Sequence, residues 1–245
     1  MRIAHLSDLH LRHHLPGTAS LPDRLSRAMP QRFAQALQQI RALAPDLLVI
    51  TGDLLDYPFD ALDDPIAQEL ARRDLYLIAD LIADVPAPLA LVHGNHDHPA
   101  LVAEVFGHVP ADQVVDGYRI LAFADDEGLE HVPVREGDSL ARFQTALADP
   151  ASPPQVHVQH YVVWPERNEE YPHTYGAGAA MREAILAAGN VRLVLSGHYH
   201  TGVPLFGDQS TYFATVPGFA VLPHPFALYE LAAGGRVTAQ AYRLA

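Results

Sequence analysis

Five short groups of polar residues follow one another along this chain of 245 residues. They are Asp8-Leu9-His10, Gly52-Asp53, Gly94-Asn95-His96-Asp97, the single His160, and Gly197-His198-Tyr199-His200. Together they offer carboxylate, imidazole and amide groups, which suit Mn, Fe, Zn or Co where no thiolate is present. The set is large enough to hold two metal ions, and two neighbouring ions are a recurring means of hydrolysing a phosphate ester. The sequence therefore predicts a hydrolytic site with two metals.

The spacing inside these groups favours shared binding of an ion. Asp8 and His10 lie two residues apart at an expected strand end, and side chains at i and i+2 of a strand point the same way. His198 and His200 repeat this spacing. Gly52 permits a tight turn that leaves the next carboxylate projecting. Taken singly, each group also occurs as a polar strand end, a turn or a capped loop, so the ordered set of five is what favours a metal site.

The polar groups mostly follow apolar stretches that predict buried strands. Strands are expected at residues 2–6, 47–50, 89–92, 118–124, 155–159, 191–195, 211–215, 226–231 and 237–243. Helices are expected at residues 30–43, 66–85, 101–106, 139–148 and 179–188. Alternating strands and helices followed by a strand-rich tail indicate an α/β (α+β) fold, in which loops at the carboxyl edge of a sheet converge on a site. With no linker or internal repeat, residues 1–245 are expected to form a single domain.

The composition limits the classes of protein and partner. Hydrophobic residues make up 49% of the chain, which is enough for a sizeable core. The formal net charge of −13 weighs against stable, sequence-independent binding of DNA or RNA. The absence of cysteine excludes disulfides, thiolate ligands and a Cys nucleophile. Because no apolar stretch suits a signal peptide or a membrane span, we expect a cytoplasmic protein that stays outside the membrane.

From Asp8 to His200, the ordered set resembles the calcineurin-like metallophosphoesterase superfamily. It is most similar to the branch called class III cyclic-nucleotide phosphodiesterases, which carries Asp-x-His, Gly-Asp, Gly-Asn-His-Asp, His and Gly-His-x-His. It is less similar to the protein Ser/Thr phosphatases, since their Gly, Arg-Gly and Glu are replaced here by Leu11, Tyr57-Pro58 and Asp97. The resemblance implies a four-layer αββα sandwich of two mixed β-sheets flanked by helices, with the tail supplying part of the second sheet.

The resemblance also implies roles for individual residues. The first ion would be bound by Asp8, His10, Asp53 and His200. The second ion would be bound by Asp53, Asn95, His160 and His198, so that Asp53 bridges the pair. His96 would be the general acid or phosphate-contacting group, and Asp97 would orient it or stabilise its protonated form.

The implied activity is hydrolysis of a phosphodiester bond in a small nucleotide-like or related substrate. Two ions about 3.5–4 Å apart hold a bridging water and lower its pKa, so that hydroxide attacks phosphorus in line. The ions are expected to be Mn or Fe first, with Zn, Co or Ni as alternatives. They and His96 offset the charge on the equatorial oxygens, and a protonated His96 donates to the leaving oxygen.

Three other functions stay open on the sequence alone. A phosphomonoesterase acting on a small metabolite or nucleotide carries similar motifs. So does a nuclease, although the acidic charge and the lack of an added DNA-binding domain weigh against it. A metal-free scaffold is disfavoured because every ligand position is filled. The sequence leaves the substrate, the native metals and the oligomeric state open.

Several residues near the motifs have two interpretations. Residues 164–178 form a long expected loop after the fourth motif, and such loops beside a site are often functional. This loop is equally a substrate cap or an ordinary surface or dimer contact. Asp56 is expected to cap a helix or turn, with contact to a histidine beside the ligands as the alternative. A substrate contact is open to His13 and His14. His131 has no partner motif and is expected to be structural.

Overall fold

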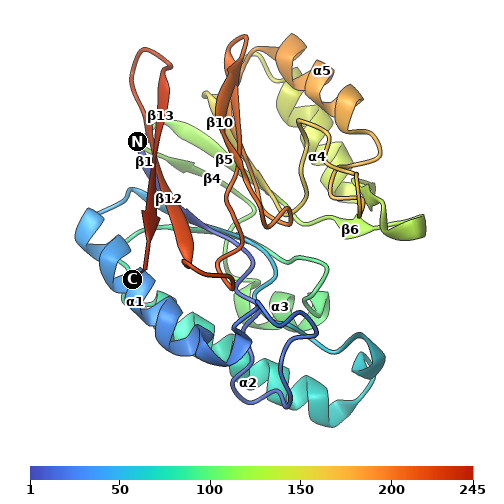
Figure 1. Cartoon of the computed structure of the whole chain (residues 1–245). Helices are drawn as coiled ribbons and strands as arrows, with labels where there is room; N and C mark the ends of the chain where they lie inside the picture. Colours follow the sequence, from blue (N-terminus) through green and yellow to red (C-terminus); the bar gives the residue numbers. More distant parts are fainter. Residues whose placement is uncertain (245) are drawn as a thin grey trace.

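Two large β-sheets form the centre of the computed structural model, which describes residues 1–244 (Figure 1). The five-stranded sheet runs in the order β13 (Val237–Arg243), β12 (Pro225–Leu231), β1 (Arg2–Leu6), β2 (Leu47–Thr51), β3 (Leu89–Val92). The six-stranded sheet runs in the order β10 (Val203–Asp208), β11 (Thr211–Thr215), β9 (Val191–Ser196), β8 (Gln155–Gln159), β5 (Tyr118–Phe123), β4 (Asp112–Val115). Both sheets are mixed, because each combines parallel with antiparallel strand pairs.

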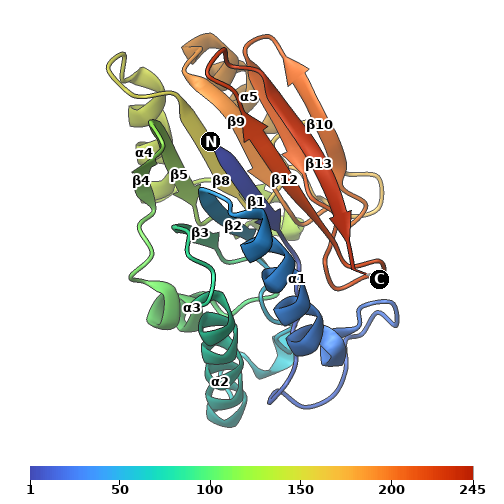
Figure 2. The ribbon, with the colours of Figure 1, turned by 90° about the vertical axis from the view of Figure 1, so that its left-hand side faces the viewer.

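Helices cover the outer face of each sheet, as Figures 1 and 2 show. The five-stranded sheet is covered by α1 (Met29–Leu43), α2 (Pro65–Ile82) and α3 (Pro99–Phe106). The six-stranded sheet is covered by α4 (Gly137–Ala148) and α5 (Gly178–Ala188). Short elements complete the chain: η1 (Ser26–Ala28), η2 (Phe59–Ala61), η3 (Leu129–His131), and a hairpin of β6 (Asp126–Glu127) and β7 (Pro133–Val134). The predicted four-layer αββα sandwich is confirmed.

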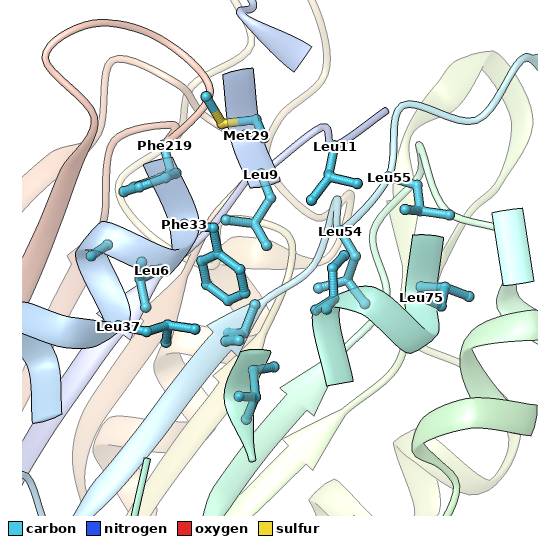
Figure 3. Close-up of a cluster of buried hydrophobic side chains, with 14 of the residues drawn as sticks. Leu6, Leu9, Leu11, Met29, Phe33, Leu37, Leu54, Leu55, Leu75 and Phe219 are labelled. Atoms are coloured by element: carbon cyan, nitrogen blue, oxygen red, sulfur yellow. The ribbon is translucent and has the colours of Figure 1, made fainter. Parts of the chain in front are cut away.

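The inner strands are buried on both faces, as their unbroken apolar runs predict. In β2, Leu48 and Ile50 face the helices, whereas Leu47 and Val49 face the other sheet. Figure 3 shows the helix-side cluster, in which Phe33 and Leu37 of α1 gather with Leu6 and Leu54. The second cluster lies between the two sheets and the third lies beneath α4 and α5.

The same helix-side cluster anchors the loops that carry the polar groups. Leu9 and Leu11 alternate with Asp8 and His10, and both leucines are fully buried in the cluster (Figure 3). Leu54 and Leu55, which follow Asp53, are buried there as well. The leucines of these loops are therefore fixed in the helix-side cluster, whereas the neighbouring polar side chains lie outside it.

The observed elements agree with most expected ranges and differ at the edges of the sheets. The expected strands at 2–6, 155–159, 211–215 and 237–243 are found at those residues. The helix expected over 66–85 ends at Ile82, and β4 and β10 were not expected. The tail adds strands to both sheets, since β10 and β11 join one while β12 and β13 join the other. Among the helices described, none combines the length and apolar character needed to span a membrane.

Candidate metal centre

The five polar groups converge beyond the carboxyl ends of β1, β2, β3, β8 and β9. The segments after β1 and β2 run side by side, because the Asp8 amide donates to the Gly52 carbonyl (3.0 Å) and the His10 amide to the Asp53 carbonyl (2.9 Å). In the other sheet, the Gly197 amide donates to the His160 carbonyl (2.8 Å). These backbone bonds fix the spacing of the side chains that the loops carry.

A first group of ligand atoms comes from Asp8, His10, Asp53 and His200, and all lie within 4.8 Å of one another. The Nε2 atoms of His10 and His200 approach to 3.1 Å. His200 Nε2 lies 3.3 Å from Asp8 Oδ1, and His10 Nε2 lies 3.4 Å from Asp53 Oδ2. Because Asp8, His10 and Asp53 are buried, this group forms a closed polar cluster within the protein.

A second group shares Asp53 with the first. It adds His160 and His198, again with one ligand atom each within 4.8 Å of the others. His160 Nε2 lies 3.1 Å from His198 Nδ1, 3.2 Å from Asn95 Oδ1 and 3.5 Å from Asp53 Oδ1. Asp53 thus presents Oδ1 to this group and Oδ2 to the other, which is the arrangement that a bridging carboxylate requires.

The chemistry of these residues fits a pair of bound cations. Burial lowers the pKa of His10, His160 and His198, so these imidazoles are neutral at pH 7, the form that binds metal. Burial raises the pKa of Asp53 to about 8, and Asp8 Oδ1 is buried without a hydrogen-bond partner. Divalent cations would supply positive charge to both carboxylates and the partner that Asp8 Oδ1 lacks.

The backbone is strained where the side chains converge. The φ angles of Asp8, His10, Asp53 and His198 are 57°, 44°, 50° and 65°, in the left-handed region that few such residues adopt. We had expected strand alternation to point Asp8 and His10 the same way. Because β1 ends at Leu6, strand alternation does not apply to these two residues. Their shared left-handed conformation accompanies that convergence. Strain of about 1–3 kcal/mol per residue is typical of functional sites, where the surrounding structure must hold it.

Two glycines allow the loops to meet. Gly52 has a φ of +87°, and a Cβ there would lie 2.7 Å from both Gly94 N and His160 Nδ1. A Cβ on Gly94 would lie 2.6 Å from Asp53 N and would overlap the Asp53 carboxylate. The motifs therefore need glycine at these positions because three loops touch there, as well as for the tight turn.

His96 lies beside the ligand groups and is held by residues other than those we expected. Its Nδ1 lies 3.4 Å from Asp56 Oδ1, and its Nε2 lies 3.3 Å from Arg24 Nη1. Arg12 anchors Asp56 from the other side, with Nε and Nη2 each 2.9 Å from Oδ2. Burial works against the charged form, but the neighbouring His96 and Arg12 lower the pKa of Asp56. Asp56 is thus an anionic partner of His96. The alternative of a histidine contact is therefore supported over the helix or turn cap that we favoured.

Asp97 has a different place from the one expected. Its carboxylate accepts backbone N–H groups from Leu54 (3.1 Å), Leu55 (2.8 Å) and Gly94 (2.9 Å). Within residues 1–244, no contact joins its carboxylate to the imidazole of His96. Asp97 therefore ties two motif loops together, and Asp56 takes the orienting position. The spacing of Asp56, three residues after Asp53, is the sequence signal that pointed to it.

A cavity of about 890 Å³ opens onto both ligand groups. Six of its lining residues belong to the expected motifs: Asp53, Asn95, His96, His198, Tyr199 and His200. Others come from loops that carry no motif: Leu21, Asp23, Arg24, Phe59, Glu127, Gly128, His131, Glu170, Tyr171 and His173. No sequence pattern points to Arg24, Glu127 or Phe59, because only the folded chain brings their loops to the site.

The loop 164–178 contributes to this cavity through its middle part. Tyr171 donates its hydroxyl to Glu127 Oε1 (2.8 Å), and Glu127 Oε2 lies 2.8 Å from His131 Nδ1. The ring of His173 lies 5.1 Å from that of His198. The loop and the β6–β7 hairpin therefore form one wall, which includes His131, although we expected that residue to be structural.

His13 and His14 lie away from the cavity lining. Their backbone amides donate to Asp74 of α2 at 3.0 and 2.7 Å, and His14 Nδ1 also lies 2.7 Å from this buried carboxylate. The Leu15 amide donates to it as well (3.1 Å). These contacts fix the start of the loop after β1, so the proposed substrate contact of the two histidines is not supported.

Comparison with known proteins identifies the family. The model of the calcineurin-like phosphoesterase family matches residues 1–202. The chain belongs to this family. A Synechococcus protein named a probable cyclic nucleotide phosphodiesterase is 28% identical over 245 residues, which cover 96% of this chain and 86% of the relative. The resemblance inferred from the motifs is thereby confirmed.

Solved structures of the family share the fold. A dimetal phosphatase from Danio rerio has a TM-score of 0.71 at 16% identity, covering 95% of this chain and 93% of its own. The calcineurin-like phosphoesterase YfkN from Bacillus subtilis has a TM-score of 0.56 at 14% identity, covering 99% and 90%. The family, together with the clustered histidines and aspartates, indicates a metal-binding phosphoesterase.

Proposed function

We propose that this chain, acting as one domain, hydrolyses a phosphodiester bond of a small nucleotide-like substrate. The observation that carries the proposal is the position of Asp53 between two buried ligand groups at a cavity of about 890 Å³. Asp8, His10, Asp53 and His200 would hold the first ion. Asp53, Asn95, His160 and His198 would hold the second. Imidazole, carboxylate and amide donors favour Mn or Fe in this pair, with Zn, Co or Ni as alternatives.

When bound, the two ions supply Lewis acidity and a nucleophile at neutral pH. The remaining work falls to side chains around them. His96 borders the cavity, where it can contact the phosphoryl group and donate a proton to the leaving oxygen. Asp56 Oδ1 lies 3.4 Å from the other ring nitrogen, where it can hold the orientation of the imidazole. Asp56 is thus proposed as the positioning residue for His96.

The size of the cavity supports a diester. Cavities of roughly 300–1,000 Å³ commonly hold ligands much larger than a phosphate. The wall formed by Glu127, His131 and Tyr171 borders space beyond the ligand groups, where a substituent on the phosphate would lie. The Synechococcus relative named a probable cyclic nucleotide phosphodiesterase agrees with this choice. A monoesterase is the second candidate, because a structural neighbour is a dimetal phosphatase.

Metal content and substrate preference test the proposal together. Protein purified without chelator is analysed by mass spectrometry and assayed with Mn on bis-p-nitrophenyl phosphate and p-nitrophenyl phosphate. Asp53→Asn removes the shared carboxylate, and Asp63→Asn makes the same change on an exposed residue. Two metals per chain and faster diester cleavage, both lost only in Asp53→Asn, support the proposal. Faster monoester cleavage favours the second candidate, and absence of both metal and turnover overturns both.

A further inference from the structure

Arg24 is a cationic residue in a cavity that is otherwise acidic. Of the residues that line it within the described chain, four are acidic (Asp23, Asp53, Glu127 and Glu170), one is arginine and none is lysine. A substrate phosphate brings negative charge into this space, and guanidinium groups bind phosphate oxygens through paired N–H donors. Apart from bound metal ions, Arg24 is therefore the group best suited to that charge.

The guanidinium has donors to spare and lies beside the proposed reaction centre. Its Nη1 is 3.3 Å from His96 Nε2 and 3.6 Å from Asp56 Oδ1. The side chain is only 11% exposed, and its buried Nε has no hydrogen-bond partner. A guanidinium carries five N–H donors, and the two contacts above involve only Nη1, so donors remain for an anion next to His96.

The loop around Arg24 is well anchored. The Arg24 amide donates to the Leu21 carbonyl (3.1 Å), and the next amide, of Leu25, donates to the Ala220 carbonyl (2.9 Å). Ser26 donates back to the Arg24 carbonyl (2.9 Å), and its hydroxyl accepts the Ala19 amide (3.2 Å). The guanidinium is therefore held in place before substrate arrives, which reduces the entropy lost on binding.

A purely structural role for Arg24 would be to neutralise Asp56. Arg12 already does so, with two nitrogens 2.9 Å from Asp56 Oδ2, whereas Arg24 lies at 3.6 Å, beyond a hydrogen bond. Resting on the function proposed above, we propose that Arg24 binds the non-bridging oxygens of the substrate phosphate beside His96. It fixes the phosphate at this end of the cavity and leaves the Glu127 side to the substituent.

The test uses Arg24→Gln, Arg24→Lys and, as a matched control, Arg41→Gln, which removes the same charge from the exposed last turn of α1. Orthophosphate binding is measured by calorimetry on metal-loaded protein. Metal content, melting temperature, and KM and kcat for bis-p-nitrophenyl phosphate are measured on the same samples.

For Arg24→Gln we expect orthophosphate to bind roughly 10- to 100-fold more weakly, because a hydrogen bond from a charged donor is lost. Metal content and melting temperature stay unchanged. Arg24→Lys is intermediate because it lacks the paired donors, and added guanidinium partly restores turnover by Arg24→Gln.

The outcomes separate this inference from the proposed function. Wild-type orthophosphate affinity and KM in Arg24→Gln would overturn the role of Arg24 and leave the phosphodiesterase in place. Loss of bound metal or of folding in Arg24→Gln, with Arg24→Lys equal to wild type in every readout, would show a structural role instead. A wild-type protein that hydrolyses neither ester would overturn the proposed function. The orthophosphate titration would still report whether Arg24 binds the anion.

Discussion

Gly94→Ala tests whether close packing of the motif loops holds the metal ligands in place. The added Cβ would lie 2.6 Å from Asp53 N and 2.7 Å from His160 Cε1, and would overlap Asp53 Oδ1. The backbone of Asp53 is tied to His10 (2.9 Å), and the ring of His160 is tied to the Thr51 carbonyl (2.6 Å). Rotating one side chain cannot relieve these contacts, so at least one loop must shift.

The size of the effect follows from this geometry. Overpacking of a filled interior typically costs about 1–3 kcal/mol. In a domain of this size each kcal/mol lowers Tm by roughly 2–4 °C, so Tm of the metal-free protein should fall by about 2–12 °C. Because Asp53 belongs to both ligand groups, metal content should drop below two ions per chain although every ligand residue is retained.

Thermal unfolding in chelator, metal analysis and bis-p-nitrophenyl phosphate turnover measure these effects. The control is Gly234→Ala, since a Cβ at Gly234 meets nothing within 4 Å. If Gly94→Ala melts with Gly234→Ala and binds two metals, the loops are less tightly packed than described and the reasoning fails.

Three further predictions concern buried charges. Asp97→Ala leaves three backbone N–H groups without their acceptor. The free energy of unfolding measured with urea should therefore fall by about 1–3 kcal/mol or more. An unchanged urea midpoint contradicts this. Burial raises the pKa of Asp53 from an unfolded value of 3.8 to about 8. Its ionisation therefore lowers the stability of the fold as pH rises from the unfolded pKa to the folded one. In chelator at pH 9, Asp53→Asn should therefore melt no lower than wild type. Burial lowers the pKa of His157, so its contribution to stability is lost as pH falls below the unfolded value of about 6.5. His157→Phe should lose less melting temperature than wild type between pH 7 and 5, and equal losses would refute this.

The inner strands and the convergence of the candidate ligand residues could be predicted from the sequence, because both depend on short local patterns. A run such as Leu47-Leu48-Val49-Ile50 is apolar on both faces, which is typical of a strand between two layers. The polar residues follow these runs directly, so predicting the strands also predicted the edge where the ligands meet. The positions of α1 and β8 followed from equally local signals.

The edge strands and the cavity wall lacked such signals. β4 is only half-buried and β10 contains Pro204 and Gly207, so neither has an apolar run. Arg24 and Glu127 lie about a hundred residues apart in sequence, and only the packing of distant loops brings them to one cavity. The exchange of roles between Asp56 and Asp97 has the same cause. Both follow a ligand closely, and the direction of each carboxylate depends on contacts across loops.

The candidate ligands and the loop residues that line the cavity differ in how they are held in the fold. We expect the former to carry the chemistry and the latter to determine which substrate is preferred. The candidate ligands follow central strands, and the loops that carry them are joined by backbone hydrogen bonds. Asp8 and His10 also alternate with leucines of the core, so we expect substitutions at the candidate ligands to alter both metal binding and folding. Arg24, Phe59 and the wall of Glu127, His131 and Tyr171 lie on loops, and their side chains belong to none of the core clusters. Loops of this kind tolerate change without loss of the scaffold. Substrate preference in this chain should therefore respond to substitutions in those loops at a melting temperature and metal content close to wild type, whereas substitutions at the ligands change all three together.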